Sequence, residues 1–331
     1  MKVLNEREYG LLERLVSLSQ SELHKTLGVY LKSKYKNIII EKEYIVAVGD
    51  IPIALVAHMD TVFYNQPEEI YYDQRKGVLW SPDGLGADDR AGIFAILQIV
   101  QSGLRPSIIL TTDEERGGLG AQKLAKKECP IPFLRYMIQL DRKGSNDCVF
   151  YDCLNPQFIK YVESFGFTEA IGSFSDISFL MPAWKICGVN LSVGYKDEHT
   201  IAETLNINCL FATIEKVKKM LSEEISIPAF EYREVSNRLN DYFAEMRPYN
   251  YEADYDMGTP CKRCGKYFFD FELIPVKGHD IKKMVYYCPD CMINHVNWCD
   301  TCGYAYEMGD PEDDIDMCKD CMEVATGVQN N

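Results

Sequence analysis

Positive charge is scarce in this chain of 331 residues. The 35 lysines and arginines are outnumbered by 50 aspartates and glutamates, which gives a formal net charge of -15. This excess of negative charge repels phosphate backbones and argues against nucleic acid as a partner. Long apolar runs are also missing. Apolar residues make up 47% of the chain, enough for a sizeable core, but no run of them could cross a bilayer, so no membrane partner is expected.

A signal peptide is the next missing feature, because residues 1–10 are polar and contain no apolar core. Thirteen cysteines in a chain without such a signal indicate a reducing compartment and metal binding instead of disulfides. We therefore expect a cytoplasmic protein. Five cysteines lie singly among apolar residues and are expected to be buried free thiols: Cys129, Cys148, Cys153, Cys187 and Cys209.

Residues 1–225 alternate between strand-like apolar runs and helical patterns. Strands are expected at 37–48 and 71–80 (each as a hairpin), 51–56, 107–112, 133–140 and 185–193. Helices are expected at 6–34 (one or two), 89–100, 121–127, 156–165 and 202–222. This alternation predicts an α/β fold in which a mixed, mostly parallel sheet is flanked by helices on both faces.

The pattern changes after residue 225. Residues 226–259 are polar and rich in tyrosine and acidic residues, which is typical of a linker, with one short helix expected at 232–246. Residues 260–325 have little apolar periodicity but many cysteines. The sequence therefore predicts a large domain, a linker and a small cysteine-rich, zinc-binding domain.

Histidines and carboxylates recur at or just after the ends of the predicted strands of the large domain. Five blocks carry them, and they contain His58, Asp88, the pair Glu114 and Glu115, Asp141, and His199. The adjacent glutamates would repel each other unless a cation lay beside them. Imidazole and carboxylate together suit zinc with an open coordination position. The set exceeds the needs of one ion and fits two zinc ions bridged by a shared carboxylate.

With these five blocks in this order, residues 5–225 resemble the co-catalytic di-zinc exopeptidases. This family includes the zinc aminopeptidases, peptidase T, carboxypeptidase G and their deacylase relatives, and the resemblance implies a zinc-exopeptidase (phosphorylase/hydrolase-like) fold. It also implies the metal ligands: His58 and Asp141 for the first zinc, Glu115 and His199 for the second, and Asp88 as the bridge.

The resemblance further implies two catalytic roles. Glu114 would be the general base that deprotonates the bridging water, and Asp60 would orient the imidazole of His58. The intervals 60–88 and 141–199 are too short to hold the lid or dimerisation domain that many relatives insert, which favours a compact, aminopeptidase-like branch.

The same compactness leaves the group that stabilises the oxyanion open, since no lid can supply it. Tyr195, close to His199, is a candidate that could equally be a packing residue. Arg142 could bind a substrate carboxylate or pair with Asp88 or Asp89. Asp176 lies in a polar segment that could line the substrate pocket.

The cysteine-rich segment contains four Cys-x-x-Cys pairs: Cys261 and Cys264, Cys288 and Cys291, Cys299 and Cys302, Cys318 and Cys321. Eight thiolates predict two structural four-cysteine zinc sites, in addition to the two catalytic zinc ions. The pairs could combine sequentially, as zinc ribbons, or in an interleaved cross-brace. The acidic composition of this segment argues against nucleic acid and favours protein binding, substrate gating or oligomerisation.

The leading hypothesis is a zinc-dependent amide hydrolase, an aminopeptidase acting on short peptides. The first alternative is an amidohydrolase or deacylase that uses the same metals on a non-peptide N-acyl substrate. The second alternative is a protein-recognition module that acts through its zinc-ribbon-like tail.

Overall fold

The computed structural model describes residues 2–222, 227–233, 259–264, 267–268, 274–277, 284–288, 291, 296–298 and 305–307. The chain divides into two compact units, Met1–Glu245 and Met246–Asn331. Each unit is described by itself.

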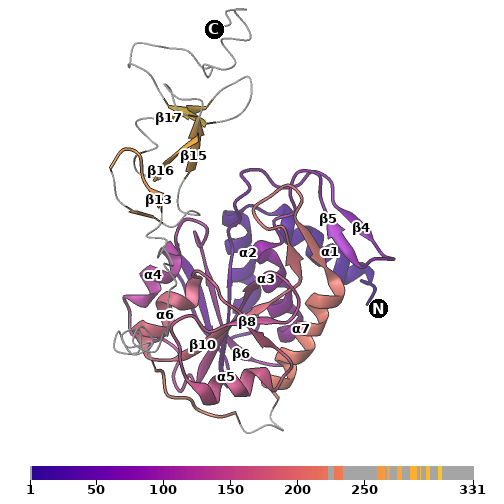
Figure 1. The fold of residues 1–331 in the computed structure, drawn as a ribbon. Coiled ribbons are helices and arrows are strands. Elements are labelled where there is room, and N and C mark those ends of the chain that lie inside the picture. Colours follow the sequence, from indigo (N-terminus) through magenta and orange to yellow (C-terminus); the bar gives the residue numbers. More distant parts are fainter. Residues whose placement is uncertain are drawn as a thin grey trace, which may run out of the picture. The chain divides into compact units, whose positions relative to one another are not determined.

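An eight-stranded sheet forms the centre of the first unit (Figure 1). Its strands, in spatial order, are β1 (Asn37–Ile40), β2 (Tyr44–Val48), β6 (Pro106–Thr111), β3 (Ile51–His58), β7 (Tyr136–Arg142), β10 (Cys187–Ser192), β8 (Asp147–Val149) and β9 (Thr168–Glu169). The four central strands, from β6 to β10, pair in parallel, whereas the β1–β2 hairpin and β8 join them antiparallel. The predicted mixed, mostly parallel sheet is confirmed.

Helices cover both faces of this sheet (Figure 1). They are α1 (Glu6–Ser17), α2 (Gln20–Lys32), α3 (Ala87–Gln101), α4 (Leu119–Ala125), α5 (Pro156–Glu163), α6 (Asp176–Trp184) and α7 (Ile207–Met220). Helix α3 packs on β3 and β7 and is itself covered by α1 and α7, whereas α6 packs on β3, β7 and β10 beside α4. None of the helices in the described part of the chain is both long and apolar enough to cross a membrane.

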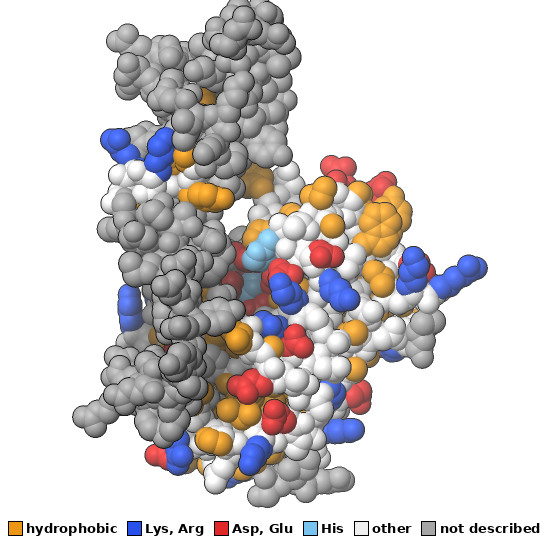
Figure 2. Space-filling model, in the orientation of Figure 1, with side chains coloured by type: hydrophobic (Ala, Val, Ile, Leu, Met, Phe, Trp, Pro, Cys, Tyr) orange, Lys and Arg blue, Asp and Glu red, His pale blue; other side chains and the backbone are white. Residues whose placement is uncertain are grey.

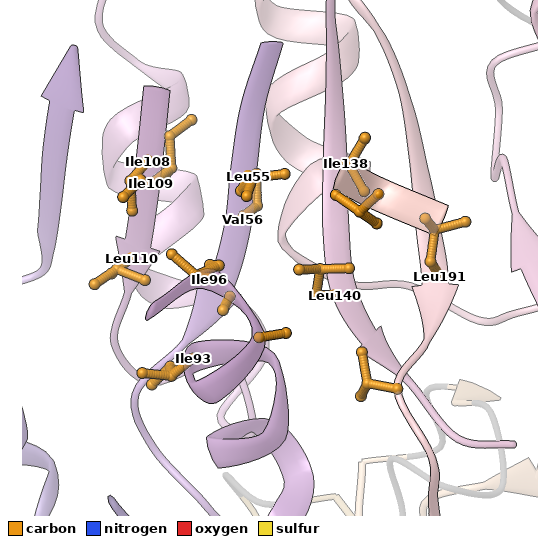
Figure 3. Packing of buried hydrophobic residues seen from close by; sticks show 14 of the residues in the cluster. Leu55, Val56, Ile93, Ile96, Ile108, Ile109, Leu110, Ile138, Leu140 and Leu191 are labelled. Atoms are coloured by element: carbon orange, nitrogen blue, oxygen red, sulfur yellow. The ribbon is translucent and has the colours of Figure 1, made fainter. Parts of the chain in front are cut away.

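The core lies between these layers. Leu55 on β3, Ile109 on β6 and Leu140 on β7 are fully buried, or nearly so, together with Ile93 and Ile96 of α3 (Figure 3). Strands that are buried on both faces need continuous apolar runs, which is why their sequences do not alternate. Each such side chain contributes about 1.5–3 kcal/mol to stability by leaving water. The rigid strands fix the positions of the residues at their ends.

A second, antiparallel sheet lies beside the first and has the order β11 (Tyr195–Lys196), β12 (Thr204–Asn206), β5 (Val78–Trp80) and β4 (Tyr71–Asp73). Strands β4 and β5 form the hairpin predicted for 71–80. The loop between β11 and β12 carries His199, so this small sheet positions one of the predicted metal ligands.

The structure refines the predicted elements and adds the short strands β8, β9 and β11, which were not predicted. The expected helix 202–222 begins only at Ile207, because Thr204–Asn206 pairs with β5 and Asn206 accepts hydrogen bonds from the first backbone N–H groups of α7. Residues 6–34 form two helices, broken at a second capping box around Ser19. Helix α6 was not predicted, because it begins in a polar segment and contains Pro182.

The segment 227–233 lies within the predicted linker and packs on the first unit. The ring of Phe230 contacts the rings of Tyr136, Phe158 and Tyr161. The backbone N–H of Leu154 donates to the carbonyl of Arg233 at 2.8 Å. The short helix expected at 232–246 falls almost entirely outside the described residues.

In the second unit most of the described residues lie in strands, and the described cysteines lie outside them. Strands β13 (Thr259–Pro260) and β14 (Tyr267–Phe268) pair antiparallel. A four-stranded sheet has the order β16 (Met284–Tyr287), β15 (Ile274–Lys277), β18 (Ala305–Glu307) and β17 (Val296–Trp298).

Candidate metal centre

Three of the predicted ligand blocks meet because parallel strands end at one edge of the main sheet. His58 is the last residue of β3 and lies opposite Thr111, the last residue of β6. Glu114 and Glu115 follow β6 directly, and Asp141 is near the end of β7, the other neighbour of β3. Ligands of open α/β sheets bind outside the carboxyl ends of the strands. The ligand blocks therefore stand where such a site is expected.

Asp88 reaches this edge from the start of α3. Asp88 and Asp89 have non-helical backbone angles, and the peptide bond between them is cis. The carboxylate of Asp89 accepts hydrogen bonds from the backbone N–H groups of Gly92 (2.9 Å) and His58 (3.3 Å). Gly92 has no space for a side chain, since a Cβ there would lie 2.1 Å from the carbonyl oxygen of Leu140. Gly92, the last residue of the sequence Gly-Ala-Asp-Asp-Arg-Ala-Gly, therefore allows the start of α3 to pack closely against β7.

The five predicted ligands form two groups that share Asp88. In the first group, His58 Nε2 lies 3.2 Å from Asp88 Oδ1 and 3.5 Å from Asp141 Oδ1. In the second group, His199 Nε2 lies 3.2 Å from Asp88 Oδ2 and 3.0 Å from Glu115 Oε2. Within each group the three candidate donor atoms all lie within 4.8 Å of one another. The two oxygens of one aspartate therefore face two different histidines.

These distances fit bound metal ions. Tetrahedral nitrogen and oxygen ligands about 2.0–2.1 Å from zinc lie roughly 3.3 Å from one another. The observed separations of 3.0–3.5 Å bracket that value. Glu115 Oε1 is also buried without a hydrogen-bond partner, which leaves an oxygen free for an ion. The residues present fit two cations, one on each side of Asp88.

The pKa shifts of the buried acidic residues and of His58 also favour bound cations at this site. Burial raises the pKa of Glu114 well above its ordinary value, and the charges of Asp141 and Asp176 add to the effect. Burial would lower the pKa of His58, but Asp141 and the neighbouring aspartates raise it well above its ordinary value. Figure 2 shows histidine and acidic side chains gathered at one place on this face of the molecule. Divalent cations would relieve the repulsion among these carboxylates.

Asp60 contacts His58 and the backbone of Glu114 and Glu115. Its Oδ1 lies 3.2 Å from Nδ1 of His58, so the carboxylate can orient that imidazole, as the resemblance implies. It also accepts the backbone N–H groups of Glu114 and Glu115, each at 3.0 Å. One buried carboxylate therefore fixes His58 and both glutamates together. Glu114 Oε2 lies 3.9 Å from His58 Nε2, beside the first group of ligands.

The three candidate substrate-binding residues have different surroundings. The hydroxyl of Tyr195 is buried and donates to Asp141 Oδ1 at 3.0 Å. Arg142 donates to the carbonyl of Ile171 and lies 3.8 Å from Asp147 Oδ2, so its partner is neither Asp88 nor Asp89. Asp176 is fully buried, and its Oδ2 accepts from the Thr111 hydroxyl at 2.6 Å and from the Gln139 amide at 3.3 Å.

The polar segments 173–176 and 190–195 are expected from the sequence to line the substrate pocket, but the contacts of their residues with Asp141 were not predicted. Asn190 bonds both the backbone N–H and the carbonyl of Asp141, at 3.0 and 2.7 Å. The hydroxyl of Ser175 donates to Asp141 Oδ2 at 2.6 Å. Asn190 and Gln139 stand out as polar residues within buried, apolar strands, and that signal could have identified them. Glu203, which contacts the backbone at Asp88, has no comparable signal in the sequence.

The second unit brings four of the eight predicted structural ligands together. The sulfur atoms of Cys261, Cys264, Cys288 and Cys291 all lie within 4.8 Å of one another. The sulfur atoms of Cys264 and Cys288 are 3.9 Å apart, close to the roughly 3.8 Å expected between thiolates of a tetrahedral zinc site. Burial raises the pKa of Cys261, but backbone N–H donors at Cys264 and Cys288 lower it to about 6 overall, which favours the thiolate.

This cluster combines the first and second Cys-x-x-Cys pairs, so it follows the sequential pattern. Cys299, Cys302, Cys318 and Cys321 lie outside the described residues. None of the nine described cysteines forms a disulfide. Of the five expected buried thiols, Cys148, Cys153 and Cys187 are buried, and Cys129 and Cys209 are partly exposed.

Comparison with known proteins shows the class of fold. Neither protein-family models nor curated proteins give a match to this sequence. Among solved structures, the aminopeptidase PepT from Bacillus cereus ATCC 10987 is 15% identical, with a TM-score of 0.53 over 66% of this chain and 98% of its own. A tripeptidase from Staphylococcus aureus subsp. aureus Mu50 is 14% identical, with a TM-score of 0.54 over the same shares.

A TET aminopeptidase from the marine sediment archaeon Thaumarchaeota archaeon SCGC AB-539-E09 is 11% identical, with a TM-score of 0.51 over 66% of this chain and 97% of its own. At such identities the likeness establishes the fold alone. The chain has the fold of these aminopeptidases, so the fold implied by the resemblance to the co-catalytic zinc exopeptidases is confirmed.

Proposed function

We propose that this protein is a di-zinc aminopeptidase that cleaves the N-terminal residue from short peptides. The observation that carries the proposal is the sharing of Asp88, whose two oxygens face His58 and His199 separately. The similar structures are an aminopeptidase, a tripeptidase and a TET aminopeptidase, which supports a peptide substrate. The many free thiols fit a cytoplasmic location.

The residues of the site have separate tasks. His58 and Asp141 would hold one zinc ion, Glu115 and His199 the other, and Asp88 both. When bound, such a pair of ions polarises a carbonyl and lowers the pKa of water towards neutrality.

Glu114 receives the proton of the attacking water and returns it to the leaving amine. It stands beside the ligands without being needed as one, and burial raises its pKa towards the range in which it can do both. Asp60 keeps the Nε2 atom of His58 pointed at the site.

Glu114→Gln tests the proposal against a panel of dipeptides, tripeptides and aminoacyl amides. The amide cannot accept a proton, so kcat should fall by about 10²–10⁴-fold while zinc content stays that of the wild type. Glu215→Gln, an exposed change on α7, is the control and should leave turnover unchanged. Equal turnover by Glu114→Gln and the wild type would remove Glu114 from this role.

The same panel separates peptidase from deacylase activity. An aminopeptidase requires a free α-amino group, so N-acetylated versions of its best peptides should not be cleaved. Cleavage of the blocked compounds but not the free ones would favour the amidohydrolase reading of the same metal centre.

For the second unit we propose structural zinc. Cys261, Cys264, Cys288 and Cys291 would hold one ion, and the remaining two pairs a second. Such ions would supply folding energy to this unit, which has only a small core. We expect the unit to bind a protein partner. Elemental analysis should give about four zinc ions per chain, whereas about two would favour a recognition protein whose hydrolase unit is not metallated.

A further inference from the structure

Glu203 is a buried carboxylate with an unusual set of partners. It follows His199 by four residues, in the loop between β11 and β12, and only 1% of its surface is exposed. Its Oε2 accepts the backbone N–H groups of Gly86 (2.5 Å) and Ala87 (3.1 Å), and its Oε1 accepts that of Asp88 (3.0 Å). A single side chain therefore holds three consecutive amides that end at the bridging ligand.

These three amides need partners from outside their own segment. The first N–H groups of a helix have no acceptor within the helix, and α3 begins here. Gly86 precedes it with a φ of 66° and offers no side-chain cap. A negative carboxylate suits this position because the helix start carries partial positive charge. Glu203 supplies from a distant part of the chain the cap that the local sequence lacks.

The other end of Glu203 is anchored beside His199. The backbone N–H of Glu203 donates to the carbonyl of Thr200 at 3.1 Å. The hydroxyl of Thr200 donates to the carbonyl of Asp197 at 2.7 Å, which closes the turn around His199. Thr204, the next residue, pairs with Trp80 of β5. The His199 turn is therefore tied to the small sheet on one side and to the Asp88 segment on the other.

We propose that Glu203 is a positioning residue that sets the distance between Asp88 and His199 and so determines the affinity of the second metal site. The proposal rests on the proposed function, because it presumes that these two residues share an ion. The imidazole of His199 is about half exposed, so packing alone does not hold it in place. The hydrogen bonds of Glu203 connect the His199 turn to the Asp88 segment. They therefore hold His199 in place and also position Asp88, the proposed bridging ligand.

Glu203→Gln is the variant of choice because it keeps the size of the side chain. One end of the new amide is an N–H donor and would face the backbone N–H groups that Glu203 now accepts. The matched control is Asn155→Ala. Asn155 is also buried, and its side chain accepts the backbone N–H groups of Gln157 and Phe158 at the start of α5, away from all predicted ligands.

The experiment titrates the full-length, metal-stripped chain with Co²⁺ and follows its absorption. Thiolate charge-transfer bands report the cysteine sites, and weaker visible bands report the nitrogen and oxygen sites, so the units are read separately. In Glu203→Gln, the affinity for the second ion of the hydrolase site should fall about 10- to 100-fold, as is common when a residue that orients a ligand is changed. The affinity for the first ion should fall less, because Asp88 is the only one of its ligands that Glu203 holds, and the thiolate bands should not change.

Two further readouts distinguish positioning from general destabilisation. In Glu203→Gln, hydrogen exchange at the amides of residues 86–88 should accelerate, and kcat should fall at saturating metal with little change in KM. Asn155→Ala should lower the melting temperature without altering either Co²⁺ step.

Wild-type affinity for the second ion in Glu203→Gln would overturn the proposal, as would an equal loss of affinity in Asn155→Ala. A wild-type chain that binds no pair of ions at its nitrogen and oxygen sites would instead overturn the proposed function itself.

Discussion

At the residue scale, the candidate site contains side chains that each contact two or more partners. Asp88 faces two histidines, and Asp60 contacts His58 and the backbone of both glutamates. Asp141 is held on three sides, by Asn190, Ser175 and Tyr195. This sharing fixes the ligand positions before any ion binds, which is the condition for tight and specific metal binding.

Tyr195→Phe tests whether that tyrosine supports a ligand or stabilises an oxyanion. Its hydroxyl proton is already donated to Asp141, so we expect kcat to fall less than about 10-fold, far short of the 10²–10³-fold loss typical of a missing oxyanion donor. Steady-state kinetics at saturating zinc measures this. A loss of the larger size, with metal affinity unchanged, would show that Tyr195 acts on the substrate.

The grouping of the candidate ligands is largely predictable from sequence for a simple reason. Most of them follow an apolar run or start a helix, and the ends of parallel strands meet at one edge, whereas His199 lies in the loop between β11 and β12 of the small antiparallel sheet. The surroundings of Asp176 are not predictable in this way: its segment is polar, yet it is buried against Thr111 of β6 and Gln139 of β7, the strands on either side of β3. Glu203 depends on a contact across 115 residues or more, and local patterns carry no trace of such contacts.

At the element scale, α3 and the central strands place the ligands. The start of α3 lies so close to β7 that only glycine fits at position 92. The longer strands and most helices follow from apolar periodicity, whereas the short strands β8, β9, β11 and β12, helix α6 and the start of α7 do not. In α6 and at the start of α7 the local sequence is polar or contains proline, and pairing with β5 or packing on the sheet decides the structure.

Gly92→Ala tests the close packing of α3 on β7. The added methyl group would meet a backbone carbonyl and the Asp89 carboxylate, neither of which can move freely, so we expect a loss of stability of about 3 kcal/mol and weaker metal binding. Gly10→Ala in α1 is the control, since its Cβ meets nothing within 4 Å and should stabilise the helix by roughly 0.5–1 kcal/mol. Chemical denaturation measures both, and similar midpoints for the two variants would contradict this packing.

At the scale of the whole molecule, stability depends on the protons that bind to the candidate ligands and to the buried carboxylates around them. Burial raises the pKa of Asp176 and of Glu203 to about 7, and hydrogen bonds to Asp88 and Glu115 raise that of His199 to about 11. Without metal, the folded chain therefore binds more protons than the unfolded chain near neutral pH. The resulting stability is present in mild acid and is lost as the pH rises.

The melting temperature in EDTA should accordingly fall between about pH 5.5 and about pH 8. Zinc should raise it more at the higher pH, because its ligands bind in their deprotonated forms. Differential scanning calorimetry of the full chain with and without zinc gives both trends. A melting temperature in EDTA that rises over this range would show that the site is not charged as described.

The measurement that tests the central claim most directly is anomalous scattering at the zinc edge from crystals of the zinc-loaded protein. We expect two peaks beside Asp88, one about 2.0–2.2 Å from His58 Nε2 and Asp141, the other at the same distance from Glu115 and His199 Nε2. A single peak, or zinc bound elsewhere with no oxygen of Asp88 among its ligands, would contradict the two-metal centre.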